Sequence, residues 1–238
     1  MYRVAVSAGH HASAQGADRK GVTEFMETCH WQELLMETIP AQAKARRQEV
    51  EVVRIDPEKL SRKVQQINQS DCDLAIEIHF NAASDDAARG CEILYYPGSD
   101  VGMDAGRKLC VQLAAAMETK SRGVKPGWYR MDRPGVIDFY GDKDGDEMPD
   151  YFLRKTNCTA LIIEPEFLYH IEKIKERREA ACFVIGKWIA GLAGMKAQGE
   201  PVEVEAEKSA EELHEEKKVR NGRGNTGEQS NTSDSAST

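Results

Sequence analysis

The chain has 238 residues, of which 40% are hydrophobic and 30% are charged, and its formal net charge is −8. This length and composition fit one globular α/β domain of ordinary size with a possible appendage. The acidic balance argues against general nucleic-acid binding, because no basic stripe would neutralise phosphates. We therefore expect no nucleic-acid partner.

The amino terminus, MYRVAVSAGHH, lacks the basic region, the apolar stretch and the small-residue cleavage site of a signal peptide. No run of about 18 apolar residues occurs, so we expect no insertion into a membrane. The sequence thus predicts a protein that is cytoplasmic on synthesis. We expect a monomer.

Strands and helices alternate along the first 194 residues. Short apolar or β-branched runs predict strands at 2–7, 50–55, 74–80, 91–96 and 160–167. Helical spacing of apolar residues predicts helices at 23–47, 57–68, 101–120 and 172–193. The alternation is typical of a single α/β domain with a mainly parallel, twisted sheet covered by helices on both faces.

Three residues mark expected helix boundaries. Thr23 is a candidate N-cap for the first helix, and Pro40 is expected to end or kink it. Pro57 suits the first position of the second helix, because that position needs no N–H donor.

The composition changes near residue 194. Residues 195–238 hold almost no large apolar side chains, so they cannot bury enough surface to offset the entropy of ordering. We predict a disordered acidic and polar tail there, with a possible short helix at 203–218.

The cysteines form no CxxC pair and no zinc-finger spacing. They lie in apolar segments, so we expect reduced, packed side chains. The six are Cys29, Cys72, Cys91, Cys110, Cys158 and Cys182.

Two histidines lie at the ends of predicted strands. His10 follows the first strand, and His79 lies near the end of a central one. The carboxyl ends of parallel strands meet at the edge where α/β proteins bind ligands. Although a lone histidine there is more often structural, two imidazoles at one edge are half of a zinc site.

Acidic residues at the same edge can complete such a site. Glu24 stands in the first turn of the first helix, and Glu164 ends the apolar run ALIIE. A carboxylate in an apolar strand is costly unless it is paired, ligated or functional. Glu77 also lies in a strand, but it could point away and pair with a basic residue. Three ligands, a water activated by zinc and a glutamate that moves protons suffice to hydrolyse an amide.

The segment SAGHHASAQGA (7–17) resembles the first motif of the amidase 3 family of N-acetylmuramoyl-L-alanine amidases, whose first strand ends in Gly-His with Gly-Ala six residues beyond. Here the histidine is His10. The family's ligand glutamate at the start of the first helix matches Glu24 in GVTEFMET. Its Ser-Ile-His-Phe-Asn-Ala type motif matches EIHFNAA, which makes His79 the third ligand by resemblance.

The last motif of the resemblance is LRKTNCTALIIEPEFL (153–168), in which Glu164 matches the family's catalytic glutamate. The resemblance covers residues 1 to about 194. It implies one Zn²⁺, held by His10, Glu24 and His79, and cleavage of the amide between N-acetylmuramic acid and L-alanine of peptidoglycan.

The chain departs from the family pattern in several places. Ser7-Ala8 replace the Asp before Gly-His, His11 stands where Gly is usual, and Pro165-Glu166 replace the usual x-Gly. Two alternative ligands stay open: His11 in place of His10, and Glu27, one turn beyond Glu24 on the same helix face.

Residues 121–150 show no clear periodicity. Their acidic stretch resembles a calcium loop, but the positions of the EF-hand Gly and Glu hold Glu147 and Leu153. A solvated acidic loop is the preferred interpretation. The nearby aromatic and basic side chains could either contact substrate or pack as a lid; they are Trp128, Tyr129, Arg130 and Arg133.

A zinc amidase without an evident signal, membrane or wall-binding segment is expected to be a phage-type lysis enzyme that acts on the cell wall after release. Two other hypotheses stay open: a zinc peptidase that cuts stem peptides, and a non-catalytic wall-binding module.

Overall fold

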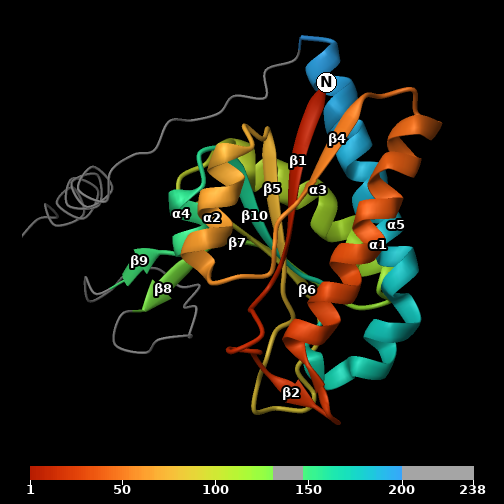
Figure 1. Ribbon diagram of the computed structural model, residues 1–238. Helices are drawn as coiled ribbons and strands as arrows, with labels where there is room; N and C mark the ends of the chain where they lie inside the picture. Colours follow the sequence, from red (N-terminus) through yellow and green to blue (C-terminus); the bar gives the residue numbers. More distant parts are fainter. Residues whose placement is uncertain (131–146, 200–238) are drawn as a thin grey trace, which may run out of the picture. The chain divides into compact units, whose positions relative to one another are not determined.

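The computed structural model describes residues 1–130 and 147–199 of the chain (Figure 1). Within them a six-stranded sheet has the order β4-β1-β5-β10-β6-β7. Its strands are β1 (Tyr2–Ala8), β4 (Val50–Arg54), β5 (Leu74–Ile78), β6 (Cys91–Tyr95), β7 (Ser121–Pro126) and β10 (Thr159–Glu164). Two short two-stranded sheets join β2 (Asp18–Arg19) to β3 (Val22–Thr23) and β8 (Trp128–Arg130) to β9 (Glu147–Pro149).

The central sheet is mostly parallel, as predicted. Strands β4, β1, β5 and β10 all run in the same direction. Strand β6 is antiparallel to β10 and parallel to β7, so the last two strands are reversed. As a result, the amino end of β6 lies at the same edge as the carboxyl ends of β1, β5 and β10.

Helices cover both faces of the sheet, which confirms the predicted layers (Figure 1). Helices α1 (Glu24–Ala45), α3 (Asp100–Ala116) and α5 (Ile171–Ala197) pack on one face, and α5 is preceded by the short η1 (Leu168–His170). Helices α2 (Leu60–Gln69) and α4 (Tyr151–Lys155) pack on the other.

Alternation along the strands separates the two cores. Along β5, Leu74 and Ile76 enter the larger core under α1, α3 and α5, whereas Ala75 between them enters the smaller core under α2 and α4. In β10, Ile162 faces the smaller core. The same parity places Glu77 and Glu164 on the α2–α4 side of the sheet.

The predicted N-cap of α1 is confirmed, but Pro40 does not end this helix and Pro57 does not open α2. Thr23 is the N-cap of α1, and its Oγ1 accepts from the backbone N of Met26 at 3.2 Å. Pro40 lies inside this helix, which continues to Ala45. The expectation that Pro57 opens the second helix is wrong: α2 begins at Leu60, after an extended N-cap residue.

Strand β7 was not predicted. Its sequence SRGVKP holds a glycine and a proline, and the pairing register shifts at its start. Proline and charged residues are typical of edge strands, because an edge strand leaves half of its backbone groups unpaired. The local pattern of an edge strand is therefore weak.

The long segment Leu168–Ala197 is long and apolar enough to cross a membrane by length and composition alone. Its apolar residues include Ile174, Ile185 and Ile189, which are fully buried in the larger core. It therefore also has the properties of a core helix packed against α1.

The cysteines of the described residues are all free, as predicted; Cys91, Cys110 and Cys182 are buried and the other three half-buried. The predicted tail and its possible helix at 203–218 lie outside the described residues, apart from 195–199, where α5 runs on to Ala197.

Candidate metal centre and active site

The candidate site lies at the edge where β1, β5 and β10 end. Backbone hydrogen bonds carry the sheet past the last strand residues: Gly9 N donates to the carbonyl of Ile78 at 2.8 Å, and His79 N donates to that of Ile163 at 2.9 Å. His10, His79 and Glu164 are therefore brought to one edge by the pairing of three neighbouring strands.

His10, Glu24 and His79 converge there as the sequence predicts. Glu24 Oε2 lies 2.9 Å from His10 Nε2, and Glu24 Oε1 lies 3.1 Å from His79 Nδ1. One donor atom from each of the three residues lies within 4.8 Å of the others. The two imidazole rings meet edge to face, with centroids 4.9 Å apart.

Glu24 is held in place by backbone donors. Its side chain is buried, and its oxygens accept from Phe80 N at 2.9 Å and from Ala17 N at 3.3 Å. Burial by itself raises the pKa of Glu24, but the hydrogen bonds with His10 and His79 outweigh it and hold the pKa well below its usual value. The carboxylate is therefore charged at neutral pH.

The loop after β1 packs closely around Glu24. Gly16 has φ +73°, and a Cβ at this position would come within 2.5 Å of His10 Nε2 and 2.6 Å of Glu24 Oε2. His10 itself has φ +63°, a left-handed conformation that is rare for a non-glycine residue. The loop after β1 thus encloses the His10–Glu24 pair and leaves no room for a side chain.

A second carboxylate contacts His79 from the other side. Glu77 Oε2 lies 3.2 Å from His79 Nε2. Glu77 pairs with a basic residue, as expected, because Lys63 Nζ of α2 lies 2.8 Å from its Oε1. The expectation that Glu77 could point away from the ligand edge is wrong, because its Oε2 faces His79. Burial raises the pKa of Glu77, but Lys63 and His79 more than offset it and lower the pKa to about 2.

Glu164 is a buried carboxyl group whose pKa is shifted in the opposite direction from those of Glu24 and Glu77. It is 6% exposed, and its Oε2 has no hydrogen-bond partner among the described atoms. Burial raises its pKa to about 8, and the nearby carboxylates Glu24 and Glu92 add to the rise, against an opposing effect of His79. Burial therefore favours the protonated form of this carboxyl group.

The carboxylate opposite Glu164 in the ladder is Glu92 of β6. Glu92 is fully buried, and its Oε2 accepts from Arg122 Nε at 2.5 Å and from Lys125 Nζ at 2.7 Å. Burial raises the pKa of Glu92, but these two cations hold it below its usual value.

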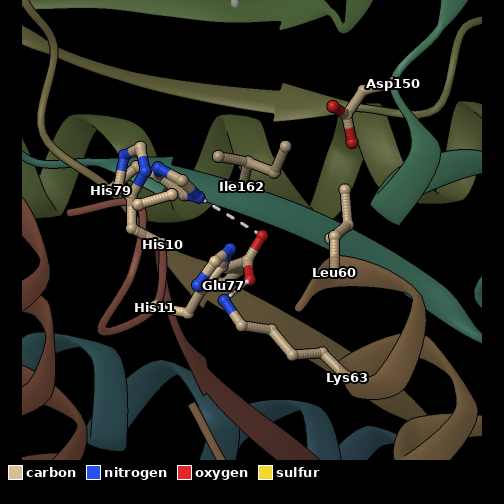
Figure 2. Close-up of a pocket in the computed structure, with 9 residues that line it drawn as sticks. His10, His11, Leu60, Lys63, Glu77, His79, Asp150 and Ile162 are labelled. Carbon is tan, nitrogen blue, oxygen red and sulfur yellow. Dashed lines mark hydrogen bonds and ion pairs between the residues drawn. The ribbon is translucent and has the colours of Figure 1, made fainter. Parts of the chain in front are cut away.

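A cavity of about 250 Å³ opens beside His10, His79 and Glu77 on the α2–α4 side (Figure 2). His10 and His79 lie together at one end, and Leu60 and Asp150 lie toward the other. The remaining lining residues are His11, Ala14, Lys63, Glu77 and Ile162.

Neither alternative ligand joins the cluster. His11 lines the cavity, but its Nδ1 lies 3.0 Å from Ser13 Oγ. Glu27 is fully buried apart from His10 and His79. Its Oε1 accepts from Trp31 Nε1 at 3.1 Å and lies 3.4 Å from Arg178 Nε of α5, and its Oε2 lies 3.7 Å from His30 Nδ1.

Only some of the candidate residues between 121 and 150 lie within the described residues. Trp128 is buried, while Arg133 and the acids from 142 to 146 lie outside the described residues, as do the side chains of Tyr129 and Arg130. Asp150 serves as the N-cap of α4, with its Oδ1 accepting from Phe152 N at 2.8 Å.

Sequence reasoning missed Lys63 altogether. It stands in the polar helix LSRKVQQINQ, and nothing in its sequence neighbourhood separates it from exposed lysines. The one available signal was Glu77, a carboxylate in a buried strand that required a cationic partner.

The donor set fits a zinc ion. Two imidazole nitrogens and one carboxylate form a three-residue ligand set of the kind found in catalytic zinc sites. His79 has a carboxylate on its other nitrogen, as metal-bound histidines usually do. The missing Cβ of Gly16 provides the space in which His10 and Glu24 approach each other.

Fold and site together have the features of a metal-dependent hydrolase with an α/β sheet. The profile of the amidase 3 family, described as N-acetylmuramoyl-L-alanine amidase, matches residues 4–181. The chain belongs to this family.

Solved structures of amidases share the fold. The N-acetylmuramoyl-L-alanine amidase of Clostridium difficile 630 has TM-score 0.64 at 18% identity, over 83% of this chain and 98% of that one. The catalytic domain of CwlV, an N-acetylmuramoyl-L-alanine amidase of Bacillus (Paenibacillus) polymyxa var. colistinus, has TM-score 0.59 at 17% identity, over 84% and 100%. The catalytic domain of an endolysin targeting Clostridia difficile has TM-score 0.53 at 22% identity, over 85% and 100%. No curated protein sequence matches the chain significantly.

Proposed function

We propose that this chain is a zinc-dependent N-acetylmuramoyl-L-alanine amidase that hydrolyses the amide between the lactyl group of N-acetylmuramic acid and L-alanine in peptidoglycan. Family membership supports the reaction. The observation that carries the proposal is the convergence of His10, Glu24 and His79 at the strand end next to a buried, unpaired Glu164.

His10, Glu24 and His79 would hold the zinc ion. When bound, zinc supplies Lewis-acid chemistry, which polarises a carbonyl and lowers the pKa of water. The charged state of Glu24 suits a ligand, because a carboxylate must be deprotonated to bind metal.

Glu164 is assigned the proton transfers. Its carboxylate accepts a proton from the attacking water and then delivers it to the nitrogen of L-alanine as the amide bond breaks. A group that both accepts and donates works best with a pKa near the operating pH, and burial places the pKa of Glu164 at about 8 in the metal-free protein.

The cavity on the α2–α4 side is the proposed place for the substrate next to the reacting amide. It reaches from the two histidines past Ile162 to Leu60, so it offers apolar and polar surface together. Its walls come from strands β5 and β10, from the loop after β1, from Leu60 and Lys63 of α2, and from Asp150.

Mass analysis of digested peptidoglycan tests the proposed bond. We expect muropeptides split into lactyl-terminated glycans and peptides with free L-alanine amino termini. Cuts inside the stem peptide would instead support a zinc peptidase, the second hypothesis. Release of neither product by the zinc-loaded protein would support a non-catalytic wall-binding module.

A role in phage-type lysis is a further part of the proposal. The fold shared with an endolysin catalytic domain is compatible with it. Expression in a bacterial host should then leave cells intact until the membrane is permeabilised and lyse them afterwards. Lysis without permeabilisation would contradict storage in the cytoplasm. The monomeric state stays a prediction, which light scattering can test.

A further inference from the structure

Lys63 is a lysine buried where the proposed function does not need one. Its side chain is 2% exposed, at the inner side of α2. Its ammonium donates to Glu77 Oε1 at 2.8 Å and to the carbonyl of Ala8 at 2.5 Å. Burying such an ion pair seldom stabilises a fold more than apolar side chains of the same volume would. The pair therefore calls for a role other than stability.

The two carboxylate oxygens of Glu77 contact different partners. Oε1 accepts from Lys63 and from Ser7 Oγ at 3.0 Å, while Oε2 lies 3.2 Å from His79 Nε2. Figure 2 shows the carboxylate between the histidine ring and the lysine. Because Lys63 and Ser7 engage Oε1, the direction of Oε2 toward His79 is fixed.

The orientation of the His79 ring follows from this contact. The Nε2 atom of His79 faces Glu77 Oε2, and its Nδ1 faces Glu24 Oε1, 3.1 Å away. When Nε2 donates its proton to Glu77, the lone pair of Nδ1 is left for a metal. That is the nitrogen available as a metal ligand. A carboxylate on the second nitrogen both selects the tautomer and restrains the rotation of the ring.

Lys63 also reaches the strand that carries the other histidine. Ala8, whose carbonyl accepts from Lys63, ends β1 and stands two residues before His10. One buried ammonium group thus contacts the ends of both histidine-bearing strands.

Two of the positions at which this chain departs from the family motifs lie side by side. Ser7 stands in the Ser-Ala pair that replaces the family's Asp, and Glu77 stands where the second motif has Ser. Positions 7 and 77 are register partners on β1 and β5, and their side chains are hydrogen-bonded. In this chain the carboxylate of the pair is therefore on β5, two residues before His79.

We propose that Glu77 and Lys63 are positioning residues, with Lys63 holding the carboxylate of Glu77 against His79 Nε2 so that His79 Nδ1 is presented to the metal. This inference rests on the proposed function, which makes His79 a zinc ligand.

Zinc affinity measured by competition with a chelator of known affinity tests the positioning role apart from catalysis. In Glu77→Gln the neutral amide cannot accept from Lys63 and His79 as a carboxylate does. In Lys63→Met the side chain stays unbranched and flexible but loses its charge. We expect each variant to lose about 10–100-fold in zinc affinity, the loss typical of outer partners of a ligating histidine.

The matched control is Glu27→Gln, which removes a buried carboxylate that has a cationic partner in Arg178 and has no contact with His10 or His79 among the described residues. It should keep wild-type zinc affinity. The visible absorption of the cobalt-substituted protein gives a second readout, which should change in the Glu77 and Lys63 variants and not in the control. Thermal unfolding of the metal-free proteins establishes that each variant is folded.

A second substitution that restores a carboxylate provides a further test. In the background of Glu77→Ser, the substitution Ser7→Asp moves the carboxylate to the register partner on β1, and we expect it to recover part of the lost affinity. Wild-type affinity in Glu77→Gln and Lys63→Met, or an equal loss in Glu27→Gln, would overturn the positioning role. A wild-type protein that binds no zinc would instead contradict the proposed function itself.

Discussion

The two ends of the strands in the central sheet, called its two edges here, carry charged side chains in very different surroundings. At the end where β5 and β10 begin, the ion pair of Lys196 and Asp73, 2.5 Å apart, is open to solvent, with side chains 44% and 23% exposed. At the opposite edge Glu77 and Glu164 are buried in the same two strands.

Solvent makes the difference between the two edges. An exposed ion pair is worth little because water and salt screen it, whereas a buried carboxylate is costly unless it is paired, ligated or functional. The solvated edge therefore needs no explanation beyond solubility. The buried acids of the other edge indicate function, and each of them has a distinct set of contacts.

The largest effect is expected at Glu164. Glu164→Gln keeps the shape of the side chain but cannot move a proton, so kcat should fall by about 10²–10⁴-fold. Zinc affinity should be nearly unchanged, because Glu164 is not among the three converging residues. Hydrolysis of muropeptides and chelator competition measure the two quantities. A variant with wild-type kcat would remove Glu164 from the reaction.

The next largest effect distinguishes two acids of one helix. Glu24→Gln should lower zinc affinity by more than the roughly 10–100-fold typical of an outer partner, because it removes a ligand. Glu27→Gln, three residues further along α1, should leave zinc affinity unchanged and lower only thermal stability, since Glu27 contacts Trp31 and Arg178. Equal losses of affinity in both variants would contradict this assignment.

A smaller effect, on stability, separates the cross-strand partners Glu164 and Glu92 in the metal-free protein. Burial raises the pKa of Glu164 to about 8, above its ordinary 4.5. Its contribution to stability is then fully present below pH 4.5 and is lost as pH rises toward 8. As pH rises between these values, the wild type loses free energy of unfolding relative to Glu164→Gln. The difference should grow by up to about 1.4 kcal/mol per pH unit, because the glutamine does not titrate.

Glu92 should behave in the opposite way. Burial raises its pKa, but Arg122 and Lys125 hold it below the ordinary value. Its contribution is therefore present above the ordinary pKa and is lost as pH falls through the folded value. Glu92→Gln should destabilise the protein more at neutral than at acid pH. Urea unfolding across this range measures both variants, and the same slope for both would contradict the contrast.

The smallest effect belongs to the solvated edge. Lys196→Ala removes an exposed partner of Asp73 and should change the free energy of unfolding by less than about 1 kcal/mol. Added salt should reduce the difference further. A loss larger than that of Glu92→Gln would show that exposure does not separate the two edges.

Much of this site follows from local sequence. Strand ends that share one edge are enough to predict the meeting of His10, His79 and Glu164, because parallel pairing follows from the alternation of strands and helices. Glu24 and Glu27 could not be separated in this way, since side chains one turn apart lie on the same face of a helix. Only the packing of α1 against α5 directs Glu27 away from the site.

What stayed unpredicted depends on contacts between distant segments. The contact of Lys63 with Ala8 and Glu77 arises from the position of α2 over the sheet, which no pattern in a polar ten-residue helix specifies. The reversal of β6 is a property of the pairing with β10, and an apolar strand has the same pattern in either direction.

The central claim is that His10, Glu24 and His79 hold a zinc ion on which amide cleavage depends. Elemental analysis of the purified protein, combined with muropeptide hydrolysis before and after chelation, tests it most directly. We predict one zinc ion per chain, loss of hydrolysis when it is removed and recovery when zinc is returned. Full hydrolysis by protein shown to contain no metal would contradict the claim.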